Sequence, residues 1–84
     1  MGTRINRVVY KERYGGWVNK VEYADEPSSV HYTQLAAIVS AKMMLRDQGG
    51  GTLIIRGLNG HIKERIRIRP DRTISVVRIK GEYR

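Results

Sequence analysis

Residues 61–70 read HIKERIRIRP, and apolar and charged side chains alternate along them. A period of two residues is typical of a β-strand, whose successive side chains point to opposite faces of a sheet. We therefore expect the isoleucines to face a core and the cations between them to face outward. The isoleucines are Ile62, Ile66 and Ile68, and the cations are Lys63, Arg65 and Arg67. A slip of one residue would bury three cations, so the pattern favours a single register.

The amino-terminal part of the chain predicts a β-hairpin. The stretch INRVVYKERYGGWVNKVEY, residues 5–23, is rich in β-branched and aromatic residues, which strands favour. Gly15-Gly16 marks its turn, since glycine adopts a positive φ at little cost. Residues 24–29, ADEPSS, are expected to form a loop, because Pro27 lacks a backbone donor.

Residues 33–48, TQLAAIVSAKMMLRDQ, are the only long helix-forming stretch, with Thr33 as its N-cap and the glycines 49–51 as its stop. Its wider apolar stripe should pack on a sheet and consists of Ala37, Ile38, Ala41, Met44 and Leu45. A second stripe recurs every four residues beside Lys42 and Arg46, and consists of Leu35, Val39 and Met43. Two interpretations of this second stripe stay open: packing at the edge of the sheet, or contact with a partner or a second copy.

Further strands are expected on both sides of residues 61–70. TLIIR, residues 52–56, is a short buried strand, followed by an Asn59-Gly60 turn. TISVVRIK, residues 73–80, would return from a turn at Pro70 and place Ile74 opposite Ile68. The order β-β-α-β-β(-β) predicts an α+β fold, a mainly antiparallel sheet with one helix packed on one face. The other face would remain in contact with water.

Length and composition limit the classes of protein. Eighty-four residues predict a single domain over residues 1–84, and the absence of cysteine excludes disulfide scaffolds and thiolate metal sites. No apolar run reaches the ~20 residues that span a bilayer, and the amino terminus lacks a signal-peptide pattern. We expect a cytoplasmic protein without a membrane partner. The net charge is +8, and residues 51–84 contribute nine basic and three acidic side chains to it, which favours a polyanionic partner.

The ordered motifs over roughly residues 8–64 resemble a family of small bacterial proteins known as domain of unknown function 2188. The resemblance rests on Gly16-Trp17, Ser28-Ser29, Thr33, Ala37-Ile38, Ala41, Gln48 to Gly51, Leu53 to Ile55, Gly57, Gly60, Ile62 and Glu64. It implies a β-hairpin, helix, β-hairpin unit over about residues 5–69, with Trp17 in the core, and no established activity. This chain departs from the family at Arg56, where histidine is frequent, and continues into a basic carboxy-terminal extension, about residues 70–84.

Catalysis and metal binding find little support in the residues. His31 falls in a loop and His61 beside a turn, and no sequence cue links either to a nucleophile, so both are interpreted as solvated. No histidine, cysteine or carboxylate cluster has metal-ligand spacing. We therefore expect no enzyme activity, no metal, no cofactor and no small-molecule substrate.

Nucleic acid, either DNA or RNA, is the favoured partner, bound without sequence preference by a cationic sheet face. Arginine suits this task because its planar fork binds phosphate oxygens bidentately. The expected contacts are Lys63, Arg65, Arg67, Arg72, Arg78 and Lys80, together with Tyr14 as an exposed stacking residue at the hairpin tip. No run of aromatic residues and no helix-turn-helix pair supports readout of a base sequence.

The alternative is a protein–protein interaction or assembly module without a nucleic-acid role. Its interface would be the stripe Leu35, Val39 and Met43, or the exposed edge of the last strand, which a second copy could extend. In both versions a homodimer is the simplest assembly. Salt distinguishes the two hypotheses, because polyanion binding weakens steeply with ionic strength and apolar packing does not.

Overall fold

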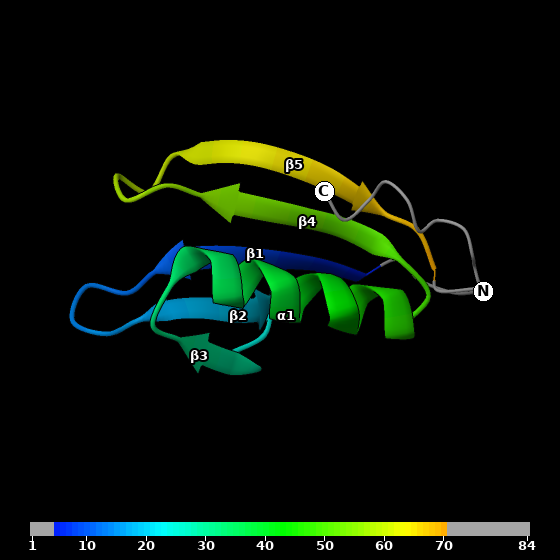
Figure 1. The fold of residues 1–84 in the computed structure, drawn as a ribbon, viewed down its shortest axis with the longest axis horizontal. Coiled ribbons are helices and arrows are strands. Elements are labelled where there is room, and N and C mark those ends of the chain that lie inside the picture. Colours follow the sequence, from blue (N-terminus) through cyan, green and yellow to red (C-terminus); the bar gives the residue numbers. More distant parts are fainter. Residues whose placement is uncertain (1–4, 71–84) are drawn as a thin grey trace.

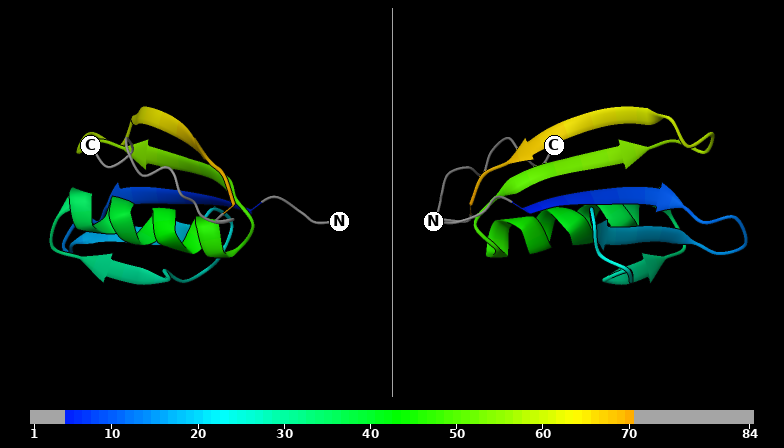
Figure 2. Two further views of the ribbon diagram at one scale, coloured as in Figure 1. Left: turned by 45° about the vertical axis from the view of Figure 1, so that its right-hand side comes forward. Right: turned by 180° about the vertical axis from the view of Figure 1, so that it is seen from behind.

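The structure is a computed structural model that describes residues 5–70, which form five strands and one helix (Figure 1). The elements are β1 Ile5–Lys11, β2 Trp17–Val21, β3 Ser29–His31, α1 Gln34–Asp47, β4 Gly51–Arg56 and β5 Ile62–Ile68. The strands make one sheet in the order β3-β2-β1-β4-β5, and seen from behind they lie in front of α1 (Figure 2). The predicted α+β fold with one helix packed on one face is confirmed.

The sheet is mainly antiparallel, as predicted, but one of its four strand pairings is parallel, which the sequence did not predict. β1 and β4 pair in parallel, with Ile5 beside Gly51 and Val9 beside Ile55. The 14-residue helix α1 causes this arrangement. Its length of roughly 21 Å, at ~1.5 Å per residue, returns the chain to the end of the sheet where β1 begins. The next strand therefore runs in the direction of β1, as crossover connections require.

The strand β3 was not predicted from the sequence. It pairs with β2 in antiparallel fashion, Trp17 with His31 and Asn19 with Ser29. Three residues are too few to display a period of two, and the proline and serines before them are typical of a loop. Pairing with β2 therefore decides the conformation of this segment.

In the hairpin between β1 and β2, neither Gly15 nor Gly16 adopts a positive φ, so the sequence interpretation of these glycines is wrong. Positive φ occurs instead at the glycines after α1 and at Gly60. Gly16 has another role, because a Cβ atom there would overlap the carbonyl oxygen of His31 on β3. The close approach of β3 to β2 depends on the missing side chain.

The helix begins and ends as predicted. The Thr33 hydroxyl accepts a hydrogen bond of 3.1 Å from the backbone N–H of Ala36, which satisfies a free donor of the first turn. At the other end, Gly49 and Gly50 adopt φ of 101° and 94°. The Gly50 N–H donates to the carbonyl of Leu45 at 2.7 Å, which closes the helix with a left-handed cap.

The core lies between α1 and the helix-facing side of the sheet. Its buried members are Val9, Trp17, Ala37, Ala41, Leu45, Leu53, Ile55 and Ile68, with Ile5, Ile38 and Ile66 packed against them. The two alanines let α1 approach the strands closely, and Trp17 is buried in the same cluster. Trp17 is thus a core residue, as predicted.

The strand β5 follows the predicted alternation in its second half only. Ile68 is buried and Ile66 packs against the core, but Ile62 is 40% exposed, so the prediction is wrong for Ile62. The register shifts between Ile55 and Arg56, which breaks the alternation at this point. The cations Lys63, Arg65 and Arg67 are exposed, as expected. The predicted strand 73–80 and its pairing with β5 lie outside the described residues.

Candidate nucleic-acid interface

Three rows of side chains cross the face of the sheet that is opposite α1, which we call the uncovered face. The first row consists of Lys20 on β2, Val8 on β1, Ile54 on β4 and Arg65 on β5, which the strand registers place side by side. The residues next to them, such as Val9 and Ile55, point into the core under α1. Because side chains alternate along a strand, this row points away from the helix.

Two further rows flank the first. One consists of Asn6, Thr52 and Arg67, and the other of Tyr10, Val18 and Val30. The ammonium nitrogen of Lys20 lies 5.9 Å from the centroid of the Tyr10 ring, within the range of a cation–π contact. An aromatic ring and a cation therefore adjoin on the uncovered face.

The centre of the uncovered face is apolar and well shielded. Val18 is fully buried, and Val8 and Ile54 are each 7% exposed, although α1 lies on the other side of the sheet. Long side chains of the neighbouring strands provide the shielding, since Tyr10, Lys20 and Arg65 stand beside these residues. We call Val8, Val18 and Ile54 the apolar floor.

Cations stand on both sides of the apolar floor. Lys20 belongs to β2 and Arg65 to β5, so three strand spacings of ~4.8 Å separate their backbones, roughly 14 Å in all. Arg67 extends the positive charge along β5, two residues further on. A nucleic-acid backbone that crosses the strands could thus contact Lys20 and Arg65 with two of its phosphates. Val8 and Ile54 lie between these two cations.

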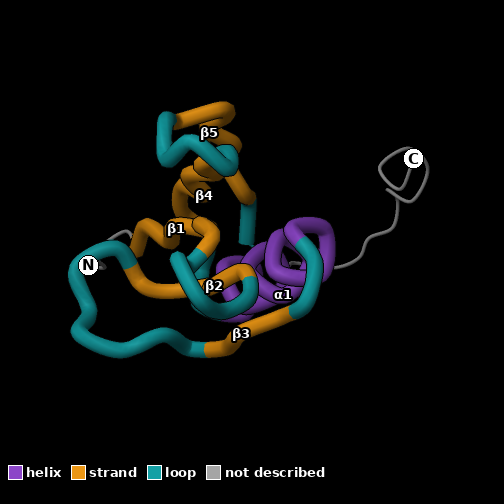
Figure 3. The backbone as a smooth tube through the Cα atoms, turned by 90° about the vertical axis from the view of Figure 1, so that its left-hand side faces the viewer, coloured by secondary structure: helices purple, strands orange, loops and turns teal. Residues whose placement is uncertain are grey.

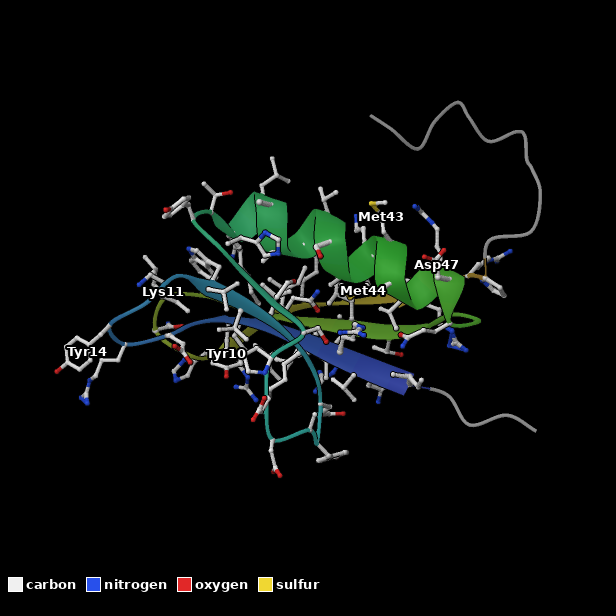
Figure 4. All side chains as sticks on the ribbon, turned by 90° about the horizontal axis from the view of Figure 1, so that it is seen from below. Tyr10, Lys11, Tyr14, Met43, Met44 and Asp47 are labelled. Carbon is white, nitrogen blue, oxygen red and sulfur yellow. The ribbon has the colours of Figure 1, made fainter. Side chains whose placement is uncertain are left out.

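The expected binding residues are only partly brought together. Arg65 and Arg67 lie on the uncovered face, and Lys63 precedes them beside the register shift. Tyr14 is 92% exposed at the tip of the first hairpin, with the Arg13 guanidinium 5.6 Å from its ring, and it is separate from the rows of the uncovered face (Figure 4). The remaining expected contacts lie outside the described residues and are Arg72, Arg78 and Lys80.

Sequence reasoning missed Tyr10 and Lys20 as members of this surface. Their alternation with Val9 and Asn19 could have placed them outward, but not opposite Arg65, because the parallel pairing of β1 with β4 was not foreseen.

The loop between β2 and β3, residues 22–28, projects from the uncovered side of the sheet (Figures 3 and 4). It carries three carboxylates, Glu22, Asp25 and Glu26, of which the last two are exposed. The amide nitrogen of Asn6 donates to Glu22 Oε1 at 3.3 Å, which ties the start of the loop to β1. The uncovered face therefore has a basic border at β5 and an acidic border at this loop.

The stripe Leu35, Val39 and Met43 faces away from the sheet. These side chains are 69%, 49% and 57% exposed, and Met43 points outward from the helix (Figure 4). Packing at the edge of the sheet, one of the two interpretations, is therefore wrong.

The family comparison covers most of these elements. Residues 7–68 match the family described as "Uncharacterized protein conserved in bacteria (DUF2188)". The chain belongs to this family. No curated protein and no solved structure matches it. The DUF2188 region contains every residue of the three rows except Asn6, and the match confirms the resemblance seen in the sequence.

Two features are absent from the described part of this DUF2188 protein. Within residues 5–70, no helix is both long and apolar enough to cross a bilayer. The same residues contain no group of three or more histidine, cysteine or carboxylate side chains that could hold a metal ion.

A buried polar network lies on the helix side of the DUF2188 sheet, and it starts at Arg7. Arg7 is 3% exposed, and its Nη1 donates to Asn19 Oδ1 at 3.1 Å and to Ser28 Oγ at 2.9 Å. Both acceptors are neutral, and Arg7 Nε is buried without a hydrogen-bond partner among the described residues. Burial disfavours the charged form and so lowers the pKa of Arg7.

The network continues through Asn19 to β3 and the helix. Because Arg7 can only donate, it orients the Asn19 amide so that Nδ2 donates toward Ser29 Oγ at 3.1 Å and Ser40 Oγ at 3.3 Å. His31 Nε2 lies 2.8 Å from Ser29 Oγ. The interpretation of His31 as a solvated loop residue is therefore wrong, whereas His61 is exposed in the turn before β5. The pairing of β3 with β2 creates this arrangement.

Proposed function

We propose that this DUF2188 protein binds nucleic acid without sequence preference through its uncovered face. One observation carries the proposal: Lys20 on β2 and Arg65 on β5 stand in one row of the uncovered face, with Val8 and Ile54 between them. Phosphate contacts dominate the affinity of such complexes, and cationic side chains such as these make them. The net charge of +8 supports attraction of a polyanion at long range.

The proposal is of a binding module without catalysis, acting in the cytoplasm. The rows of the uncovered face present hydroxyl, amide and apolar groups between the cations. Contacts from the cations to phosphates do not distinguish one base sequence from another, so binding should be non-specific.

The salt dependence of binding tests this function. We expect log affinity to fall against log salt with a slope of about −0.9 per phosphate contacted on a duplex and about −0.7 on a single strand. The double variant Arg65→Ser with Arg67→Ser removes two contacts, since both side chains point to solvent. It should flatten the slope by about 1.8 units on a duplex and by about 1.4 units on a single strand. Fluorescence anisotropy with labelled DNA at several salt concentrations measures the slope.

The matched control is Lys42→Ser with Arg46→Ser, which removes the same charge from the helix instead of the sheet. It should leave the slope close to that of the parent protein. Absence of binding to both DNA and RNA at low salt would refute the proposed function. An equal loss in both double variants would show that net charge, and not the uncovered face, drives binding.

A second candidate function is self-association through α1. The exposure of Leu35, Val39 and Met43 favours it, because they form a continuous apolar stripe on the outer surface of the helix. An antiparallel pairing centred on Val39 would place Leu35 of one copy opposite Met43 of the other. It would also bring Arg46 of one copy toward the 99%-exposed Tyr32 ring of the other, a cation–π contact, and keep the basic helix ends apart.

Val39→Glu tests self-association, because it places a charge at the centre of that pairing. We expect the parent protein to sediment as a dimer at high salt and this variant as a monomer. Leu58→Glu is the control, since Leu58 is 79% exposed in the turn between β4 and β5 and far from the helix stripe in sequence. A parent protein that is monomeric at high concentration and high salt would exclude this function.

A further inference from the structure

The uncovered face has features that suit single strands better than duplexes, and the inference drawn from them rests on the proposed function. A duplex presents phosphates and groove edges, with its bases stacked inside. A single strand also presents the faces of its bases, which stack on aromatic side chains and rest on apolar surface. Among the groups of the uncovered face, the Tyr10 ring has a use in the second case only, since its neighbours Val8, Val18 and Ile54 are buried.

Tyr10 is placed to receive a base. It shares a row with Val18 of the apolar floor, and the Lys20 ammonium nitrogen is 5.9 Å from its ring centroid. A base stacked on this ring would have its phosphate within the reach of Lys20. Arg65 then meets a phosphate further along the strand, on the other side of the floor.

The loop 22–28 disfavours a duplex. It projects from the same side of the sheet as the binding rows (Figure 3) and bears Asp25 and Glu26 in exposed positions. A stiff duplex lying against β5 and crossing the sheet would bring its backbone toward these carboxylates, and like charges repel. A flexible single strand can bend to follow the row from Arg65 to Lys20.

We propose that single-stranded nucleic acid is the ligand class of the uncovered face, with Tyr10 as its stacking residue and the loop 22–28 as the element that excludes duplexes.

Parallel titrations of a labelled oligo(dT) of about 12 nucleotides and an A·T duplex of the same length test the proposal. We expect the single strand to bind at least about tenfold more tightly at low salt. Tyr10→Leu keeps an apolar side chain of fair size over Val18 but removes the ring. It should weaken oligo(dT) binding about tenfold, which corresponds to the lower part of the range for the loss of one base–aromatic stacking contact. Duplex binding should stay unchanged.

Two further variants sharpen the result. Tyr14→Leu is the matched control, because it removes an exposed tyrosine ring at the tip of the same hairpin, and it should bind like the parent protein. Asp25→Asn with Glu26→Gln should raise duplex affinity several-fold more than single-strand affinity. Circular dichroism confirms that each variant is folded.

The outcomes separate this inference from the function on which it rests. Equal affinity for duplex and single strand, or an effect of Tyr14→Leu larger than that of Tyr10→Leu, would overturn the single-strand proposal while nucleic-acid binding stands. Failure to bind DNA or RNA, single-stranded or duplex, at low salt would overturn both.

Discussion

Replacing Trp17 with Ala is expected to lower the free energy of unfolding by about 3–5 kcal/mol, as for other large buried aromatic residues. Trp17 is 9% exposed and belongs to the core between α1 and the sheet. Its truncation removes apolar contacts and leaves a cavity that the helix cannot fill, since Ala37 and Ala41 beside it are small. Because a domain of this length is stable by only about 4–13 kcal/mol, the loss is a large part of the total.

Urea unfolding followed by far-ultraviolet circular dichroism measures this loss, since the variant lacks the only tryptophan. Trp17→Phe keeps most of the buried area and should lose clearly less, which gives a measurable value if the alanine variant does not fold. Tyr32→Ala is the control, because Tyr32 is 99% exposed and its removal should change stability by less than about 0.5 kcal/mol. If Trp17→Ala and Tyr32→Ala melt alike, Trp17 is not a core residue.

Asn19→Leu is expected to cost about 3 kcal/mol or more, although leucine is similar in size and apolar. Asn19 is fully buried and accepts the hydrogen bond of the Arg7 guanidinium. Its loss takes one acceptor from the buried Arg7 cation, and the Ser29 and Ser40 hydroxyls lose the donor Asn19 Nδ2. A buried polar group left without a partner costs about 1–3 kcal/mol, more when it is charged. Thermal and urea unfolding measure the effect.

A double-mutant cycle with Arg7→Met makes this prediction specific. The double variant removes the buried cation together with its acceptor, so it should recover a substantial part of the stability that Asn19→Leu loses. Replacing a buried charge network by apolar side chains is often close to neutral. Additive losses in the double variant would show that the network between Arg7 and Asn19 does not couple the two residues.

Local signals in the sequence were sufficient for the helix and for the two main hairpins. Thr33 and the glycines 49–51 bound α1 because capping and a left-handed turn depend on a few consecutive residues. The alternation in residues 61–70 predicted the outward cations for the same reason, since side chains change face at each residue of a strand. It did not predict the exposure of Ile62, because the register shift arises in the pairing with β4.

The arrangement of the candidate site depended on contacts between segments far apart in the chain. Lys20 and Arg65 are 45 positions apart in the numbering, and only the pairing of β1 with both β2 and β4 places them in one row. The buried state of Arg7 likewise depends on Asn19 and Ser28, which satisfy it after β2 and the loop have packed. No periodicity near Arg7 distinguishes a buried arginine from an exposed one.

The sequence alone determined the α+β class, the helix and its ends, and the outward direction of Arg65 and Arg67, because each depends on spacing along a short segment. The core position of Trp17 was implied by the family resemblance and is confirmed. The tertiary structure decided the mixed sheet, the strand β3, the polar network of Arg7 and the partners of Arg65 on the uncovered face. The physical reason is that strand order and register are set by which distant surfaces bury one another, and this free energy has no local pattern in the chain.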